Sequence, residues 1–182
     1  GTPISVMPSG MGVPSAAIYI TELIRSYGVT RLIRVGTAGV YQPDVGLRQI
    51  IAAESAVTNS NLPAMIGAAG PIVGSASLLA AATATAETHD VSLITGQVFT
   101  SDVFYEPNND AQDRHTADGV LCVEMECAAL YAIAALEGVD ALAMFTMTDH
   151  LVTGEHLSSD ERQMGVDEML ELALNTAIHA TT

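Results

Sequence analysis

Arg31-Leu32-Ile33-Arg34-Val35-Gly36-Thr37-Ala38-Gly39 joins a short apolar run to two closely spaced glycines. Residues 31–35 predict a β-strand, and the glycines predict a tight turn where that strand ends. A helix is expected before the strand, because Pro14 and Ser15 suit a first helical turn and Gly28 suits a helix end. Helix, strand and glycine turn in this order are typical of an α/β protein.

The same alternation of strands and helices continues through the chain. Further strands are expected at 4–7, 47–57, 91–98, 120–125 and 141–148, and helices at 75–88, 126–136 and 158–180. Residues 58–74 predict a mobile loop and residues 108–119 a polar one. No repeat or change in composition divides the sequence, so we predict a single α/β domain over residues 1–182, with a mainly parallel or mixed sheet.

Composition excludes several classes of function. The 182 residues include 21 acidic and 6 basic side chains, all six of them arginines, for a formal net charge of −15. Binding to nucleic acid or to an anionic membrane surface requires a basic face, which this chain cannot form. Apolar residues make up 49% of the sequence, yet no apolar run reaches the length of about 20 residues that a membrane span needs.

Cys122 and Cys127 have no companions at metal-ligand spacing, so we expect reduced, buried thiols and neither a metal site nor a disulfide. Neither cysteine has a partner histidine of the kind that nucleophilic catalysis needs. Residues 1–7 lack the basic and long apolar regions of a signal peptide, which predicts a cytoplasmic protein.

Polar residues follow three of the predicted strands, at 34–39, 122–126 and 148–150. Ligands of α/β sheets bind beyond the carboxyl ends of the strands. These clusters are therefore the candidate functional residues.

Arg34 and Thr37 lie in the first cluster. Glycines expose backbone N–H groups, and the Arg34 fork and the Thr37 hydroxyl add donors that suit a small oxyanion such as phosphate. The alternative is a strand-end turn with Arg34 in a structural ion pair. Because short glycine turns are common, the pattern alone slightly favours that alternative.

Glu124 and Glu126 flank Met125 where a strand gives way to a helix. A carboxylate accepts hydrogen bonds from a vicinal diol, and a helix N-terminus favours negative charge. The alternative is a solvated glutamate at a helix start. The apolar flanks weaken that alternative, since buried carboxylates require partners.

Asp149 and His150 follow the strand at 141–148. A buried Asp with a raised pKa can act as a general acid, whereas an Asp that caps the next turn is equally compatible with the sequence. His150 is more typical of a structural residue. Arg162, at the start of the last helix, becomes of interest only as a cation that could approach Asp149.

Phe104 and Tyr105 are adjacent in a loop of a chain that has only 3 Phe and 5 Tyr. Stacking on a planar base is one interpretation, and ordinary packing is the more common one.

Together these motifs resemble those of the nucleoside phosphorylase family, most closely the hexameric purine nucleoside phosphorylases of bacterial type. The matching stretches occur in the family's order, at 10–15, 34–39, 101–105, 123–129, 148–150 and 161–163. The resemblance implies a three-layer fold with a central mixed sheet flanked by helices. It also implies phosphorolysis, in which a purine nucleoside and inorganic phosphate give a purine base and ribose 1-phosphate without a cofactor.

The resemblance also implies a role for each matching residue. It assigns phosphate to Arg34, Gly36 and Thr37; ribose to Met11, Met125 and Glu126; the base to Phe104, Val123, Glu124 and Thr148; and catalysis to Asp149, as the acid at purine N7, with Arg162 assisting. Protonating the leaving base and holding the ribose against phosphate lowers the barrier through electrostatics and positioning.

The family implies a homo-oligomer, a hexamer built as a trimer of dimers. Its members also carry an N-terminal phosphate loop, and a His and an Arg that reach the neighbouring subunit's site. This sequence begins after that region, so we expect an N-terminally truncated fold with exposed apolar surface or an open sheet edge. Thr37 stands where purine enzymes often have Ser, which preserves the hydroxyl.

Three alternatives to the function implied by this resemblance remain. Uridine phosphorylases read uracil with a Gln/Arg pair that has no counterpart here, and hydrolytic nucleosidases of the same fold need no phosphate site. The third is a catalytically impaired protein that binds nucleoside or serves in assembly.

Overall fold

A computed structural model describes residues 2–108 and 110–180, without the side chain of residue 163. Its sheet contains β1 (Arg31–Val40), β2 (Ile50–Thr58), β3 (Leu93–Thr100), β4 (Cys122–Glu124) and β5 (Asp140–His150). The strands are hydrogen-bonded in the order β1-β4-β3-β2-β5, and β5 closes the ring by pairing with β1. The sheet is mixed, because β1 pairs parallel to β5 and antiparallel to β4.

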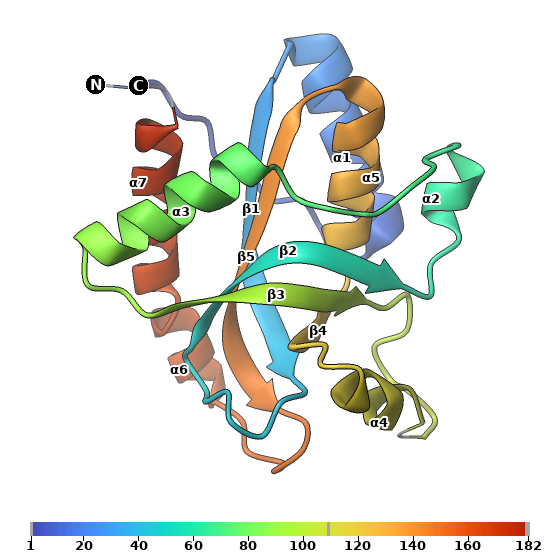
Figure 1. The fold of residues 1–182 in the computed structure, drawn as a ribbon, viewed down its shortest axis with the longest axis vertical. Coiled ribbons are helices and arrows are strands. Elements are labelled where there is room, and N and C mark those ends of the chain that lie inside the picture. Colours follow the sequence, from blue (N-terminus) through green and yellow to red (C-terminus); the bar gives the residue numbers. More distant parts are fainter. Residues whose placement is uncertain (1, 109, 181–182) are drawn as a thin grey trace.

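Helices cover the sheet on two sides (Figure 1). On one side lie α1 (Val13–Tyr27) and α5 (Cys127–Glu137), and on the other α3 (Ala76–Thr88) and α7 (Asp167–His179). Three shorter helices complete the set: α2 (Leu62–Met65), α4 (Asp110–Ala117) and α6 (Ser159–Met164). The expected three-layer α/β fold is confirmed.

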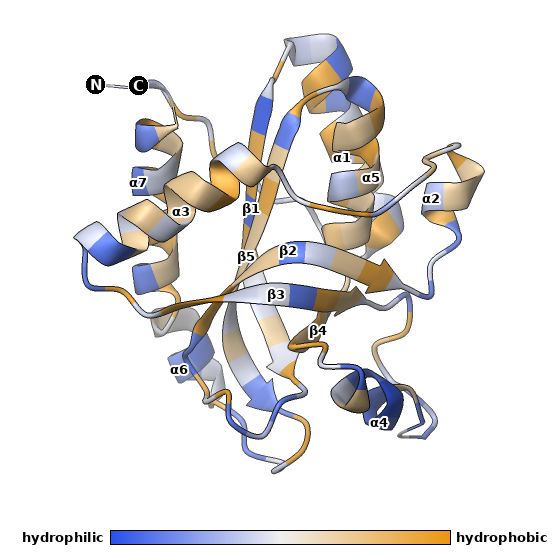
Figure 2. Ribbon diagram, in the orientation of Figure 1, coloured by the Kyte–Doolittle hydropathy of each residue, from blue (hydrophilic) through white to orange (hydrophobic). Residues whose placement is uncertain are grey.

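Helix α5 lies at the centre of the larger core cluster. Residues 127–134 are all buried, as expected for a helix that is apolar on every side, and Figure 2 shows it in contrast to the polar α4. The Tyr131 hydroxyl donates to Ala53 O at 2.6 Å and accepts from Ala143 N at 3.0 Å. One buried side chain thereby ties α5 to β2 and β5. Both cysteines are free and buried, as predicted.

Two predictions about the strands were wrong. Residues 4–7 form no strand, because no described strand pairs with them, and they are exposed. The turn expected at residues 36–39 is instead a continuation of β1 to Val40. Pairing on both sides keeps this glycine-containing segment extended, since Gly39 lies opposite Val123 of β4 and Asp149 of β5.

The predicted loops and helix ends also needed correction. The segment 58–74 contains α2, and the segment 108–119, of which residue 109 lies outside the described residues, contains α4. Acidic residues in the first turn of α4 and basic ones in its last turn complement the helix dipole. The helix expected at 158–180 is two helices, separated near Gly165, and the side chain of Ser15 forms no cap on α1.

The described strands close into a ring and leave no open sheet edge. Apolar side chains are nevertheless exposed near the start of the chain, with Val6 83% and Met11 84% accessible. Among the described helices, none combines the length and apolar character needed to cross a bilayer.

Candidate active site

The three polar clusters meet along β1. Thr37 pairs with Thr146 of β5, and Gly39 lies opposite both Val123 and Asp149. The clusters at 34–39, 122–126 and 148–150 are therefore on three adjacent strands and lie close together. Non-local pairing brings together residues that are more than 100 positions apart in the sequence.

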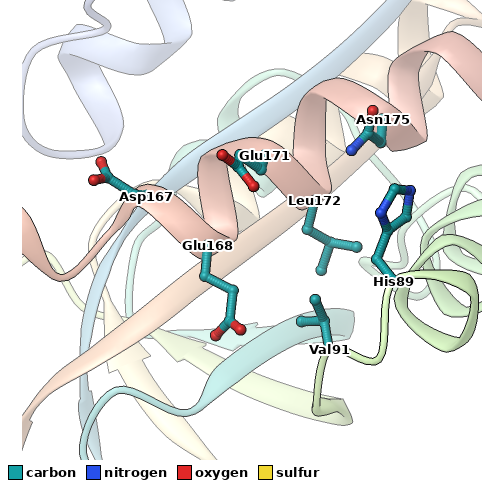
Figure 3. Close-up of a pocket in the computed structure, with 7 residues that line it drawn as sticks. All are labelled: His89, Val91, Asp167, Glu168, Glu171, Leu172 and Asn175. Atoms are coloured by element: carbon teal, nitrogen blue, oxygen red, sulfur yellow. The ribbon is translucent and has the colours of Figure 1, made fainter.

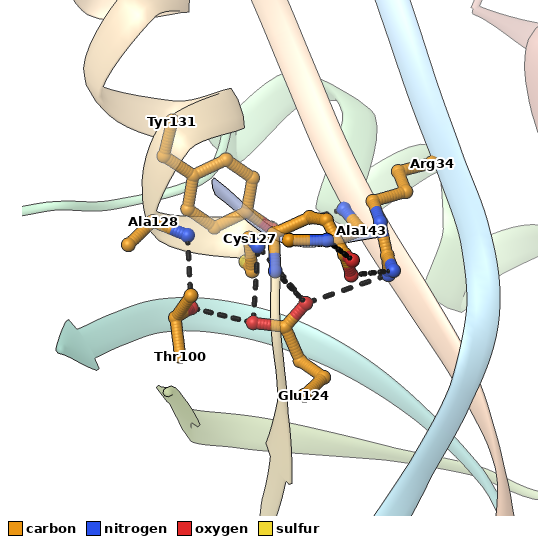
Figure 4. A network of polar contacts seen from close by, with 9 residues as sticks. Arg34, Thr100, Glu124, Cys127, Ala128, Tyr131 and Ala143 are labelled. Carbon is orange, nitrogen blue, oxygen red and sulfur yellow. Dashed lines mark hydrogen bonds and ion pairs between the residues drawn. The ribbon is translucent and has the colours of Figure 1, made fainter. Parts of the chain in front are cut away.

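Arg34 is held among carboxylates. Its Nη2 donates to Glu126 Oε2 in an ion pair, and its Nη1 lies 3.5 Å from Glu124 Oε2 (Figure 4). The guanidinium carbon lies 5.1 Å from the centroid of the Phe145 ring. The structural ion pair considered for Arg34 is thus present. Its Nε and Nη1 are buried and form no hydrogen bond, although Nη1 keeps its ionic contact with Glu124.

Gly36 provides the space that the Arg34 side chain occupies. A Cβ placed on Gly36 would lie 2.9 Å from Arg34 Nη1, closer than a carbon atom can approach without displacement. Residues two apart on a strand share a face, so any side chain at 36 would compete with the guanidinium. Thr37 is exposed beside them.

Glu124 is fully engaged by groups of the protein. Its Oε1 accepts from Thr100 Oγ1 at 2.5 Å, and its carboxylate also accepts the N–H groups of Glu126 and Cys127. Burial raises the pKa of the Glu124 carboxyl, while the Arg34 guanidinium and the Thr100 hydroxyl oppose that rise. The Glu124 side chain therefore fastens the first turn of α5 to β3 and to Arg34.

Glu126 joins the N-termini of two helices. It is the N-cap residue of α5, and its Oε1 accepts the N–H of Gly12, the N-cap residue of α1, at 2.5 Å. Met11 is thereby placed next to this carboxylate, with a side chain that is 84% exposed. Met125, half-buried, lies between the two glutamates in the sequence.

Asp149 has partners on both carboxylate oxygens. Oδ1 accepts from Arg162 Nη2 at 2.7 Å, and Oδ2 accepts from Thr148 Oγ1 at 2.8 Å. The Arg162 Nε also donates to Leu157 O at 3.0 Å, which fixes the plane of the guanidinium. These contacts bring together three of the predicted site residues.

A shift in register sets the position of Asp149. Ala38 pairs with Met147 but Gly39 pairs with Asp149, so Thr148 is an extra residue in β5. Such a shift re-aims the next side chain and often lies beside active sites. His150 is buried, and its Nδ1 accepts the N–H of Thr153 at 3.3 Å, which supports a structural role in the turn.

The aromatic loop lies beside the end of β3. Phe104 and Tyr105 are 72% and 88% exposed and meet edge to face at 5.0 Å. These two rings are therefore not packed in the core, which was the more common interpretation of such a pair. Ser101 links the loop to the site, since its N–H donates to Glu124 O at 2.9 Å, and Val123 pairs with Phe99 nearby.

Comparison with known proteins was made for the whole chain. Residues 1–180 match the family described as the phosphorylase superfamily. The chain belongs to the phosphorylase superfamily. Its mixed sheet between helix layers agrees with that assignment and with the resemblance found in the sequence.

Relatives within the phosphorylase superfamily are highly similar to this chain. It is 48% identical to a protein of Geobacillus kaustophilus named purine nucleoside phosphorylase DeoD-type, with 98% of this chain and 76% of the relative aligned. Proteins of the same name from Myxococcus xanthus and Clostridium perfringens are 46% and 47% identical. The alignments cover 97% and 98% of this chain, and 75% and 77% of those relatives.

Thr100 is a residue of the candidate site that sequence reasoning missed. It is fully buried, and its Oγ1 both donates to Glu124 and accepts the N–H of Ala128 at 2.9 Å. The indication available in the sequence was the position of Thr100 just beyond the carboxyl end of the predicted strand 91–98. Arg48 was also missed, because its contact with Glu161 depends on tertiary structure.

A hollow of about 310 Å³ lies away from the candidate site, between α7 and the turn after α3 (Figure 3). Its lining includes Glu168, Glu171 and His89, and none of the predicted site residues. Across residues 2–108 and 110–180, no group of three His, Cys, Asp or Glu side chains is arranged to hold a metal ion.

Proposed function

We propose that the chain is a purine nucleoside phosphorylase, a pentosyltransferase that converts a purine nucleoside and inorganic phosphate into a purine base and ribose 1-phosphate. One observation carries this conclusion: Arg34, Glu126 and the Asp149–Arg162 pair lie around β1, where each would meet a different part of such a substrate. The names of relatives 46–48% identical over nearly the whole chain support it.

Phosphate binds to Arg34, Gly36 and Thr37 in this proposal. The Arg34 Nε and Nη1 groups form no hydrogen bond in the structure, so they would gain acceptors from a phosphate once the guanidinium turns out of its buried position beside Glu124 and Glu126. Gly36 admits the guanidinium, and the exposed Thr37 hydroxyl adds a donor.

The ribose binds to Met11, Met125 and Glu126. Each Glu126 oxygen has one protein partner, the Gly12 N–H or Arg34, which holds the carboxylate in place and leaves it lone pairs for two neighbouring ribose hydroxyls. Positive charge develops on the ribose as its bond to the base breaks. The bound phosphate and the Glu126 carboxylate, both negative, would stabilise that charge.

The base lies toward Phe104, Val123, Glu124 and Thr148 in this arrangement. Asp149 is the general acid that protonates the purine at N7, and Arg162 assists it. The oxygens of Glu124 are already engaged by Thr100 and by backbone N–H groups, so Glu124 contributes mainly by holding Arg34 and the start of α5.

Phosphate is a co-substrate, and the reaction as proposed uses no cofactor. We also propose a homo-oligomer, a hexamer by the family resemblance, in the cytoplasm. A single domain over residues 1–182 remains a prediction, since residues 1, 109, 181 and 182 lie outside the described part.

A phosphate-dependence assay tests the function. Inosine and adenosine are supplied to the purified chain with and without phosphate, and free base is quantified. Base release only with phosphate supports phosphorolysis, while equal release without phosphate indicates a nucleosidase. No release from a folded chain that binds nucleoside would favour the alternative of an impaired nucleoside-binding protein.

A further inference from the structure

Helix α6 carries Arg162, and its described side chains form no buried apolar face. Its residues 159–162 and 164 are all exposed; the flanking apolar residues are Leu157, which is buried, and Val166, which is partly buried against the core beneath α3 and α7. A six-residue helix whose described side chains form no buried face gains little orientation from hydrophobic contacts of its own. Polar contacts therefore help to determine where Arg162 lies relative to Asp149.

Two ion pairs connect α6 to the body of the protein. One is the contact of Arg162 with Asp149, and the other joins Glu161 Oε1 to Arg48 Nη2 at 2.8 Å. Arg48 lies in the connection between β1 and β2, far from α6 in the sequence. Glu161 and Arg162 are adjacent in α6, so the ion pair with Arg48 constrains the ion pair with Asp149.

Arg48 is itself firmly anchored. Its N–H donates to Met147 O at 2.8 Å, and the Met147 N–H donates to Gln49 O at 3.0 Å. These bonds attach the connection to β5 two residues before Asp149. Arg48 also has a φ of 67°, a left-handed conformation that is unfavourable for a non-glycine residue.

Glu161 connects the anchored Arg48 to helix α6. Its Oε2 accepts from the N–H and the Oγ of Ser158, at 3.0 and 2.8 Å, and so closes the capping box at the start of α6. Its Oε1 remains for Arg48. One carboxylate thus connects the first turn of α6 to a point fixed on β5.

We propose that Arg48 is a positioning residue for the reaction: by pairing with Glu161 it holds α6 so that Arg162 meets Asp149. This deepens the proposed function and rests on it. Arg48 and Glu161 are 60% and 46% exposed, so the pair is screened by salt and its effect is moderate. Losing it lowers kcat/KM about two- to fivefold, the range expected of an exposed ion pair.

Three substitutions test the proposal. Arg48→Gln removes the charge, and Glu161→Gln removes the partner's charge while keeping a capping-box residue. Arg48→Gly removes the side chain and suits the left-handed backbone, so the Tm is expected to stay the same or rise while kcat/KM falls as it does in Arg48→Gln. That combination separates positioning from a merely structural role.

The double variant Arg48→Gln/Glu161→Gln completes a double-mutant cycle with the two single variants. It is expected to lose no more activity than either single variant, because each removes the same interaction. The matched control is Arg25→Gln, since Arg25 pairs with Glu137 at 2.6 Å and links α1 to α5 away from Asp149. The control is expected to leave kcat/KM unchanged.

Hydrogen exchange of the α6 amides gives a readout that does not need turnover. Faster exchange in Arg48→Gln supports the proposal even if the unmodified chain releases no base, an outcome that would reject the proposed function alone. Unchanged exchange in α6, activity equal to that of the unmodified chain, or additive losses in the double variant would each overturn the positioning role.

Discussion

Arg162 donates from Nη2 to Oδ1 of Asp149 over 2.7 Å, across the gap between α6 and the end of β5. The second oxygen of Asp149 accepts from Thr148 Oγ1. The orientation of this carboxylate is therefore determined by one neighbour on its own strand and one on a separate helix. If Asp149 is the general acid, its placement depends on both.

Asp149→Asn is expected to reduce purine release by about 100-fold or more, because an amide cannot deliver the proton that a general acid supplies. Nucleoside binding should persist, since the amide has nearly the same shape as the carboxyl group. Release of base in single turnovers measures the first effect, and calorimetric binding of inosine measures the second. A rate equal to that of the unmodified chain would reject the acid role.

Gly36→Ala is expected to weaken phosphate binding about tenfold. The added Cβ would lie 2.9 Å from Arg34 Nη1 and displace the guanidinium, at a cost of about 1–3 kcal/mol for overpacking. The KM for phosphate checks this. Gly46→Ala is the matched control, because a Cβ there meets no atom within 4 Å. Equal KM values for the two variants would contradict the proposed role of Gly36.

Thr100→Val is expected to lower the free energy of unfolding by about 1–3 kcal/mol, the usual cost of leaving buried polar groups without a partner. The substitution keeps the shape but removes the oxygen shared by Glu124 and the Ala128 N–H. Urea denaturation measures the loss. Thr88→Val is the control, because the exposed Thr88 hydroxyl donates to Ala84 O within its own helix. A similar loss in both variants would argue against the Thr100 bridge.

His115 is expected to make stability depend on pH. Its ring lies 4.0 Å from that of Phe99, and burial, followed by the nearby Arg114, lowers the pKa of His115. The unfolded chain then binds the proton more readily than the folded one. Stability from this residue is therefore complete above the ordinary pKa of 6.5 and is lost as the pH falls toward the lower folded value.

His115→Phe keeps a ring against Phe99 but cannot titrate. We expect the unmodified chain to lose stability relative to this variant as the pH is lowered from 7.5 to 5. Urea denaturation at several pH values gives the difference in the free energy of unfolding. A difference that stays constant over this range would show that His115 does not titrate differently in the two states.

Helices α1, α3 and α5 could be predicted because their signals are local. Apolar residues recur at helical spacing, and Gly28 and Gly138 end two of the helices in the left-handed conformation that favours glycine. The short helices α2 and α4 were missed, since each falls in a segment whose composition is typical of a loop.

The candidate site was predicted as three separate clusters, each with an ordinary structural alternative beside it. Its residue types and their order along the chain are properties of the sequence, and they were sufficient to indicate the superfamily. The contacts of each side chain could not be predicted from the sequence in the same way. Both Arg34 and Glu124 have partners on other elements, and the Thr148 shift that sets Asp149 appears only when β5 pairs with β1.

The sequence by itself determined the α/β class, the absence of a broad basic face, and the chemical groups available to a ligand. These follow from composition and short-range patterns, which do not depend on how distant segments pair. Tertiary structure alone decided that residues 36–39 are strand rather than turn, and that Arg48 meets Glu161. Strand pairing and ion pairs between distant residues form only when the chain folds, so no local pattern encodes them.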